Sequence, residues 1–149
     1  MTDQFFDTAF GGSGLLPFSL LPEALGELAA KIGATSNLLI TFRLGRFELD
    51  RDTDPGISMT LYQAAREQFS NIMKHAAATK AALKLDISRS LVTLEISDNG
   101  NGFDMHTVRK NRGLLTILGR VEQYHGTLEL KSKPGKGCLL KVSIPVVST

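Results

Sequence analysis

The sequence has little of three features that would each point to a particular class of protein: cysteine, surplus charge and long apolar runs. Cys138 is the only cysteine among the 149 residues, so neither an internal disulfide nor a cysteine-based metal cluster can form. The formal net charge of +2 is too small to indicate nucleic acid as a partner. No apolar stretch approaches the roughly 20 residues that a membrane-spanning helix needs, and the acidic start of the chain is unlike a signal peptide. We therefore expect a soluble, cytoplasmic segment without membrane or nucleic-acid contacts, whether or not a parent protein is membrane-anchored.

The composition that remains is that of one ordinary globular domain. Hydrophobic residues make up 42% of the chain and charged residues 21%, and this length encloses a core without help from disulfides or structural metal. Residues 1–16 combine scattered aromatic residues with a Gly-Gly-Ser-Gly run, which is typical of a flexible lead-in or linker. We expect a single domain over residues 17–149.

Hydrophobic periodicity predicts an alternation of helices and strand pairs. Helices are expected from Pro22 to Ile32 with Gly33 as the stop, from Ile57 to about Ala78, and from Gly113 to near Tyr124. Strand pairs are expected at 38–44 with 46–49 around a tight turn at Gly45, at 83–87 with 92–96, and at 127–132 with 138–146. This order predicts a two-layer α/β sandwich of the α+β kind, in which helices cover one face of a mixed, largely antiparallel sheet.

The longest predicted helix carries a polar stripe on one side, made of Glu67, Asn71, Lys74 and His75. The opposite side is expected to be buried against a sheet and comprises Leu61, Ala65, Phe69, Ile72, Met73 and Ala76. A carboxylate, a carboxamide and two cationic donors suit a magnesium nucleotide, because they offer oxygen ligands to a hard cation and donors to phosphate oxygens. Taken alone, the stripe is more often the ordinary solvated face of a surface helix, with i,i+4 contacts.

A glycine-rich turn, DNGNGFD at 98–104, follows directly after a predicted strand. Gly100 and Gly102 lie where the backbone must turn and where a planar ligand can approach closely. Asp98 is placed to accept a hydrogen bond from an exocyclic amine such as that of adenine, which would discriminate against guanine. Asp-Asn-Gly is equally a common hairpin turn, so this motif by itself leaves both interpretations open.

A basic loop precedes the third predicted helix and contains Arg109, Lys110 and Arg112, followed by Gly113. Its charge and the free N–H groups of a helix start suit a polyphosphate, over which the loop would close as a lid. Without the other motifs, such a loop is usually only a solvated surface segment.

In combination, these segments resemble the ATPase domain of histidine kinases, in the superfamily that includes gyrase, heat-shock chaperone and mismatch-repair ATPases. The resemblance spans roughly residues 57 to 145, and it rests on three boxes in the expected order: REQFSNIMKHA, DNGNGFD and RGLLTILGRVEQYHGTLELKSKPGKGCLLKVSIP. The ending RVEQYHGTLELKSKPGKG and the short lid are most similar to bacterial sensor kinases of the nitrate-responsive and desaturase-regulating group.

The resemblance implies a role for each matching position. Asn71 would ligate Mg²⁺, Glu67 would polarise the attacking group or accept its proton, and Lys74 and His75 would contact phosphate or ribose. Asp98 would bind the adenine amine of ATP in a pocket shaped by Gly100 and Gly102, and Arg112, Gly113 and Leu114 would meet the phosphates. Two positions depart from the family pattern: Asn111 stands where glycine is usual, and Cys138 stands where a threonine hydroxyl usually supports the aspartate.

The phosphoacceptor is not evident in this chain. The three histidines are His75, His106 and His125, and none lies in the acidic, arginine-bearing helical box that marks a kinase phosphoacceptor. The resemblance therefore implies transfer of the γ-phosphoryl group to a histidine on separate dimerisation helices, and from there to a response regulator. Two alternatives remain: a serine kinase of the anti-sigma-factor type, and a degenerate module that binds only nucleotide or a protein partner.

Overall fold

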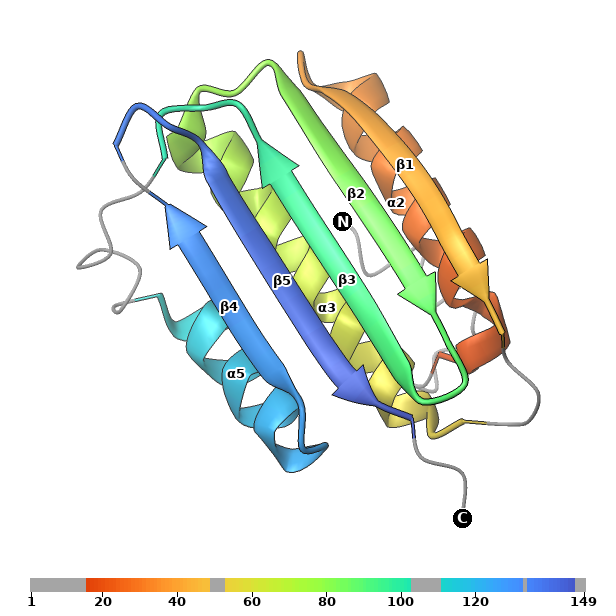
Figure 1. Cartoon of the computed structure of the whole chain (residues 1–149). Coiled ribbons are helices and arrows are strands. Elements are labelled where there is room, and N and C mark those ends of the chain that lie inside the picture. Colours follow the sequence, from red (N-terminus) through yellow and green to blue (C-terminus); the bar gives the residue numbers. More distant parts are fainter. Residues whose placement is uncertain (1–15, 49–52, 103–110, 133, 147–149) are drawn as a thin grey trace.

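The computed structural model describes residues 16–48, 53–102, 111–132 and 134–146, and it shows an open sheet with helices behind it (Figure 1). The helices are α2 (Leu21–Thr35), α3 (Pro55–Asn71) and α5 (Arg112–Gln123); a 3-10 turn, η1 (Phe18–Leu20), precedes α2, and a π-helical turn, η2 (Ile72–Ala76), extends α3. The strands are β1 (Leu39–Phe47), β2 (Lys80–Ile87), β3 (Leu91–Asp98), β4 (Thr127–Ser132) and β5 (Cys138–Pro145). No helix in these ranges is long and apolar enough to cross a membrane.

The sheet is mixed and has the strand order β1-β2-β3-β5-β4. β1 pairs with β2 in parallel, and the pairs β2–β3, β3–β5 and β4–β5 are antiparallel. Figure 1 shows α2, α3 and α5 on the same face of this sheet. The predicted two-layer sandwich with a largely antiparallel sheet is therefore confirmed.

The core lies between the sheet and the helices. On β2, β3 and β5 every second side chain is buried, as the period of a half-buried strand requires. Leu85, Leu94 and Val142 lie side by side in register across these strands and are fully buried, and Leu61 and Phe69 of α3 are buried in the same cluster. Each such side chain contributes about 1.5–3 kcal/mol, so this layer holds α3 and its polar residues in place.

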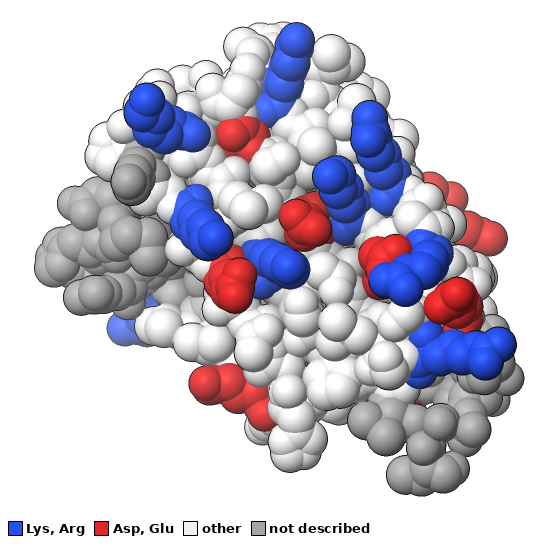
Figure 2. Space-filling model, in the orientation of Figure 1, with Lys and Arg blue, Asp and Glu red and all other residues white. Residues whose placement is uncertain are grey.

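The other face of the sheet carries a row of charged side chains (Figure 2). The row follows the strand register across the whole sheet: Arg43, Lys84, Glu95, Lys141 and Glu129. Three of its four neighbouring pairs join opposite charges, which favours strand pairing by a few tenths of a kcal/mol each, up to about 1 kcal/mol. The helices thus cover one face, and the uncovered face is polar.

The expected hairpin around Gly45 is wrong, because residues 39–47 form one strand. Gly45 lies where the register between β1 and β2 shifts, and a Cβ there would come within 2.7 Å of Asp86 Oδ1. The backbone N–H of Arg46 donates to Asp86 Oδ1 (2.9 Å), and its guanidinium Nη2 donates to Oδ2 (2.8 Å). Gly45 therefore lies in a β-bulge rather than in a turn. Because β1 and β2 are parallel, they need a crossover connection, and α3 forms it.

Two expectations about helix ends also fail. α2 continues past Gly33 to Thr35, where the Thr35 and Ser36 hydroxyls donate to the carbonyls of Lys31 (2.9 Å) and Ile32 (2.6 Å) and satisfy the helix end. The long helix ends at Ala76 rather than about Ala78, and Met73, expected to be buried, is 51% exposed. The cause is the π turn that begins at Ile72, since its wider winding rotates the following side chains out of the α-helical phase. The other two strand pairs and the third helix are confirmed.

Candidate nucleotide-binding site

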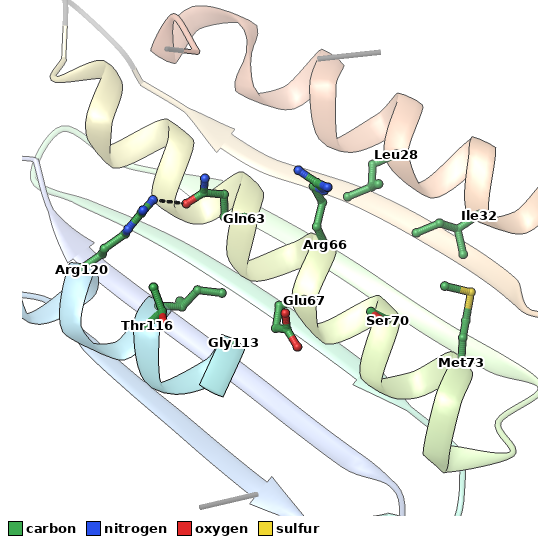
Figure 3. Close-up of a pocket in the computed structure, with 11 residues that line it drawn as sticks. Leu28, Ile32, Gln63, Arg66, Glu67, Ser70, Met73, Gly113, Thr116 and Arg120 are labelled. Carbon is green, nitrogen blue, oxygen red and sulfur yellow. Dashed lines mark hydrogen bonds between the residues drawn. The ribbon is translucent and has the colours of Figure 1, made fainter. Parts of the chain in front are cut away.

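Glu67 of α3 lies directly against the first turn of α5. A Cβ built on Gly113 would be 2.3 Å from Glu67 Oε1 and 2.7 Å from Oε2, closer than any real side-chain contact. Figure 3 shows the Glu67 side chain between α3 and Gly113. Any larger residue at 113 would push the Glu67 carboxylate aside, so two residues that the sequence predicted for the site, Glu67 and Gly113, lie in contact.

Asn71 lies one turn further along α3 and is joined to the same helix start. It is 5% exposed, and its Oδ1 accepts a hydrogen bond of 2.9 Å from Nδ2 of Asn111. Asn111 in turn caps α5, since its Oδ1 accepts from the backbone N–H of Leu114 at 3.1 Å. The structure thus brings Glu67, Asn71, Gly113 and Leu114 together around the N-terminus of α5.

The remaining basic positions are less well defined. Lys74 lies in the π turn and Arg112 is the first residue of α5, and both are exposed to solvent. The side chain of His75, the basic residues Arg109 and Lys110, and His106 lie outside the described residues. His125 is exposed just after α5. The contributions of these cations to phosphate binding stay predictions.

Asp98 ends β3 with one carboxylate oxygen free for a ligand. Its Oδ1 accepts from the N–H of Gly100 (2.8 Å), whereas Oδ2 is buried and has no hydrogen-bond partner among the described residues. Burial raises the pKa of Asp98, and the bond from Gly100 opposes that rise only in part. An unpaired buried acceptor costs about 1–3 kcal/mol, which a donor such as an amine recovers.

A pocket of about 620 Å³ lies beside Asp98, at the junction of β3, β4 and β5. Gly137 forms part of its wall with a positive φ of 78°, and a Cβ there would lie 2.3 Å from the Asp98 carbonyl oxygen. Gly102 also has a positive φ, of 75°. Gly137 is required by the close approach of the two backbones, and Gly102 by the turn. Gly100 and Gly102 are not among the residues that line this pocket, and their role in a base pocket stays a prediction.

Cys138 lies opposite Asp98 in the β3–β5 pair. It accepts a hydrogen bond from Gln68, a residue that the sequence analysis did not identify. Gln68 of α3 is fully buried, and its Nε2 donates to Cys138 Sγ at 3.4 Å. Burial, and then the charge of Asp98, raise the pKa of the Cys138 thiol to about 11, so it stays protonated. Gln68 Oε1 is, like Asp98 Oδ2, buried without a partner in the described part of the chain. The signal was present, since Gln68 is a polar residue on the apolar side of the helix.

Asp98 and Glu67 line different pockets, which share no lining residue, and Asn71 lines neither of them. Asn99, which follows Asp98, accepts hydrogen bonds from the N–H groups of Thr79 and Lys80, both at 2.9 Å, so the turn after β3 is tied to the segment that leaves α3. On the other side of Glu67, a groove of about 520 Å³ runs between α2, α3 and α5. Figure 3 shows its lining, which includes Leu28, Arg66, Glu67, Ser70, Met73 and Arg120. Glu67 can therefore be reached from solvent along a groove that the sequence did not reveal.

Known structures share this fold. The ATP-binding domain of PrrB from Mycobacterium tuberculosis aligns with a TM-score of 0.62 and 24% identity, over 91% of this chain and 100% of that one. The histidine kinase domain of the blue-light-activated kinase EL346 from Erythrobacter litoralis aligns with a TM-score of 0.66 and 17% identity, over 85% and 65% of the two chains. The fold is that of histidine kinase ATP-binding domains.

Sequence comparison defines the family. Residues 56–148 match the model of the histidine kinase-, DNA gyrase B- and HSP90-like ATPases, and the chain belongs to this family. It is 32% identical over 101 residues to the histidine-protein kinase/phosphatase DegS of Bacillus subtilis, covering 65% of this chain and 26% of DegS. It is also 32% identical over 98 residues to the sensor histidine kinase LiaS of the same organism, covering 65% and 27%. The chain thus spans about a quarter of the length of these relatives.

Proposed function

We propose that this chain is the ATP-binding catalytic domain of a sensor histidine kinase. It binds Mg-ATP and transfers the γ-phosphoryl group to a histidine on dimerisation helices of the same parent protein or of another chain, from which a response regulator takes it. The observation that carries this proposal is Oδ2 of Asp98, which is buried beside a pocket and has no partner among the residues described, since it calls for a donor such as the adenine amine. Both relatives are histidine kinases, which favours histidine over serine as the acceptor.

The residues at the start of α5 suit a magnesium-bound phosphate. No group of three or more His, Cys, Asp or Glu side chains that might hold a metal exists among the described residues. Mg²⁺ does not need such a group, because it keeps several waters and takes phosphate oxygens together with one or two protein ligands. Asn71 Oδ1 is the ligand we propose, and the ion would neutralise phosphate charge when bound.

The chain's own groups would divide the remaining work. The N–H groups of the first turn of α5 bind phosphate oxygens; the exposed cation Arg112 begins this turn, and the exposed cation Lys74 follows Asn71 by three residues. Glu67 lies at the groove and receives the proton that the acceptor imidazole loses when its nitrogen bonds to the γ-phosphorus and the bond to ADP breaks. Most of the rate enhancement then comes from positioning and charge neutralisation.

Calorimetry of Mg-ATP binding to the wild type and to Asp98→Asn tests the proposal. The substitution replaces an acceptor by a carboxamide that no longer offers a charged oxygen to the amine, and we expect affinity to fall about tenfold or more. Asp86→Asn is the matched control, because Asp86 pairs with Arg46 and lies on β2 five residues from Ala81, the register partner of Asp98. Equal binding heats for wild type and Asp98→Asn would remove the adenine pocket assignment.

A further inference from the structure

Asn111 places a single carboxamide between two elements of the proposed phosphate site. Its Nδ2 donates to Oδ1 of Asn71 (2.9 Å), and its Oδ1 accepts from the N–H of Leu114 (3.1 Å). Asn71 Oδ1 is the oxygen proposed for the metal, and Leu114 N–H is one of the donors proposed for phosphate. Both partners of Asn111 are therefore groups that a bound nucleotide would use.

The polarity of this carboxamide matches that of a magnesium–phosphate pair. Its N–H group, which carries partial positive charge, points at the oxygen that would meet the cation. Its carbonyl oxygen, which carries partial negative charge, points at the helix N–H that would meet a phosphate oxygen. An N–H group has one proton to donate, so Leu114 cannot bond Asn111 and a phosphate equally well at once.

We propose that Asn111 is a residue of the nucleotide site that acts as an internal competitor: it occupies the metal oxygen of Asn71 and the Leu114 N–H, and Mg-ATP binds by displacing it. This inference rests on the proposed function. It gives a role to a position at which the chain departs from the glycine that its family usually has. The position is half-buried at the entrance to α5, where a side chain can swing out once its two bonds are replaced.

Two substitutions separate the two contacts. Asn111→Gly removes both, so Asn71 Oδ1 and the Leu114 N–H become available to the ligand. Asn111→Ser keeps a good helix cap for Leu114, but its side chain is too short to reach Asn71. The serine variant therefore frees the metal oxygen alone.

Calorimetry with two probes, Mg-ATP and ADP in the presence of EDTA, measures each contact. For Mg-ATP, we expect Asn111→Ser to bind about two- to tenfold more tightly than the wild type, and Asn111→Gly more tightly still. For metal-free ADP, we expect Asn111→Ser to match the wild type, because the metal oxygen plays no part, and Asn111→Gly to bind more tightly. Thermal unfolding without nucleotide should show the opposite order, with Asn111→Gly the least stable because it lacks the cap.

The outcomes are distinct. Tighter nucleotide binding together with a less stable free protein supports the competitor role, since a purely structural residue would weaken both. Weaker or unchanged Mg-ATP binding in Asn111→Gly, with normal binding by the wild type, overturns the inference and leaves the proposed function standing. Absence of nucleotide binding in the wild type and in both variants would overturn the proposed function, and the inference with it.

Discussion

At the scale of single residues, Asp98, the proposed adenine ligand, costs the free protein stability. Its carboxylate loses hydration on burial, which raises its pKa, and only one of its oxygens has a hydrogen-bond partner in the part of the chain that the structure describes. Because the folded-state pKa lies above the unfolded value, this group favours folding most below about pH 4, and that contribution is lost as pH rises through the folded-state pKa. A group held at such a cost is better explained by a ligand than by stability.

Without nucleotide, we therefore expect Asp98→Asn to be more stable than the wild type at pH 7, with a difference that shrinks towards pH 4. Urea unfolding between pH 4 and 8 measures this. Asp86→Asn is the control with the opposite sign: hydrogen bonds from Arg46 lower the pKa of Asp86, so its contribution is present at neutral pH and lost as pH falls. A wild type that is more stable than Asp98→Asn at pH 7 would contradict the interpretation of Asp98.

The sequence motifs named candidate site residues, but they could not give the contacts between those residues. Asn71, Asp98 and Glu67 were found from motifs, because each motif is local. The bonds from Gln68 to Cys138 and from Asn111 to Asn71 join positions 70 and 40 residues apart, and no local pattern reports such pairs. In the sequence, Asn111 was notable only because the family resemblance leads one to expect glycine at this position. Its two hydrogen bonds depend on how α3 and α5 pack in the folded chain.

At the scale of elements, the same division explains what the sequence missed. The β2–β3 and β4–β5 pairs were predicted because alternation and short turns are local signals. Gly45 reads equally well as a turn or as a bulge until Asp86, 40 residues from Arg46, is known to hold the strand. Likewise, a prediction from periodicity assumes an α-helical phase throughout. It therefore predicted that Met73 is buried, whereas the π turn leaves this side chain exposed. Element types followed from pattern, whereas a bulge and a helix defect depended on tertiary contacts.

Helix α5 provides a matched pair of glycines for a test at this scale. Gly113 lies against the Glu67 carboxylate, whereas a Cβ on Gly119 would have nothing within 4 Å. We expect Gly119→Ala to stabilise the protein by about 1 kcal/mol through helix propensity, and Gly113→Ala to gain less than that, because its methyl group must push the Glu67 carboxylate aside. Urea unfolding measures both changes.

The two alanine variants should also differ in nucleotide binding. Gly119→Ala leaves the site untouched, so calorimetry should give wild-type affinity for Mg-ATP. Gly113→Ala forces Glu67 away from the start of α5, and we expect weaker binding. If Gly113→Ala were as stable as Gly119→Ala, the close contact between Glu67 and the helix would be refuted.

At the scale of the whole molecule, α3 and α5 are in contact near both ends. Glu67 meets Gly113 near one end, and at the other a Cβ on Gly56 would lie 1.9 Å from the Tyr124 hydroxyl oxygen. The two helices thus form an antiparallel pair on the covered face of the sheet, and the charged face lies opposite (Figures 1 and 2). Glu67 lines the 520 Å³ groove between α2, α3 and α5. We therefore expect an acceptor segment to approach Glu67 along this groove.

Phosphoryl transfer in trans tests that geometry as a whole. We expect this chain, mixed with γ-labelled ATP and a separately produced histidine-bearing helix pair of its parent protein, to label the helix pair with a phosphate that is labile in acid and stable in alkali. Glu67→Gln keeps the size of the side chain but cannot take the proton, so we expect the transfer rate to fall about 10²- to 10⁴-fold while Mg-ATP affinity stays near that of the wild type. Gln63→Glu places a carboxylate elsewhere in the same groove and serves as a control for changed groove charge. Acid-stable label would identify a serine or threonine acceptor instead, and undiminished transfer by Glu67→Gln would show that the proton leaves by another route.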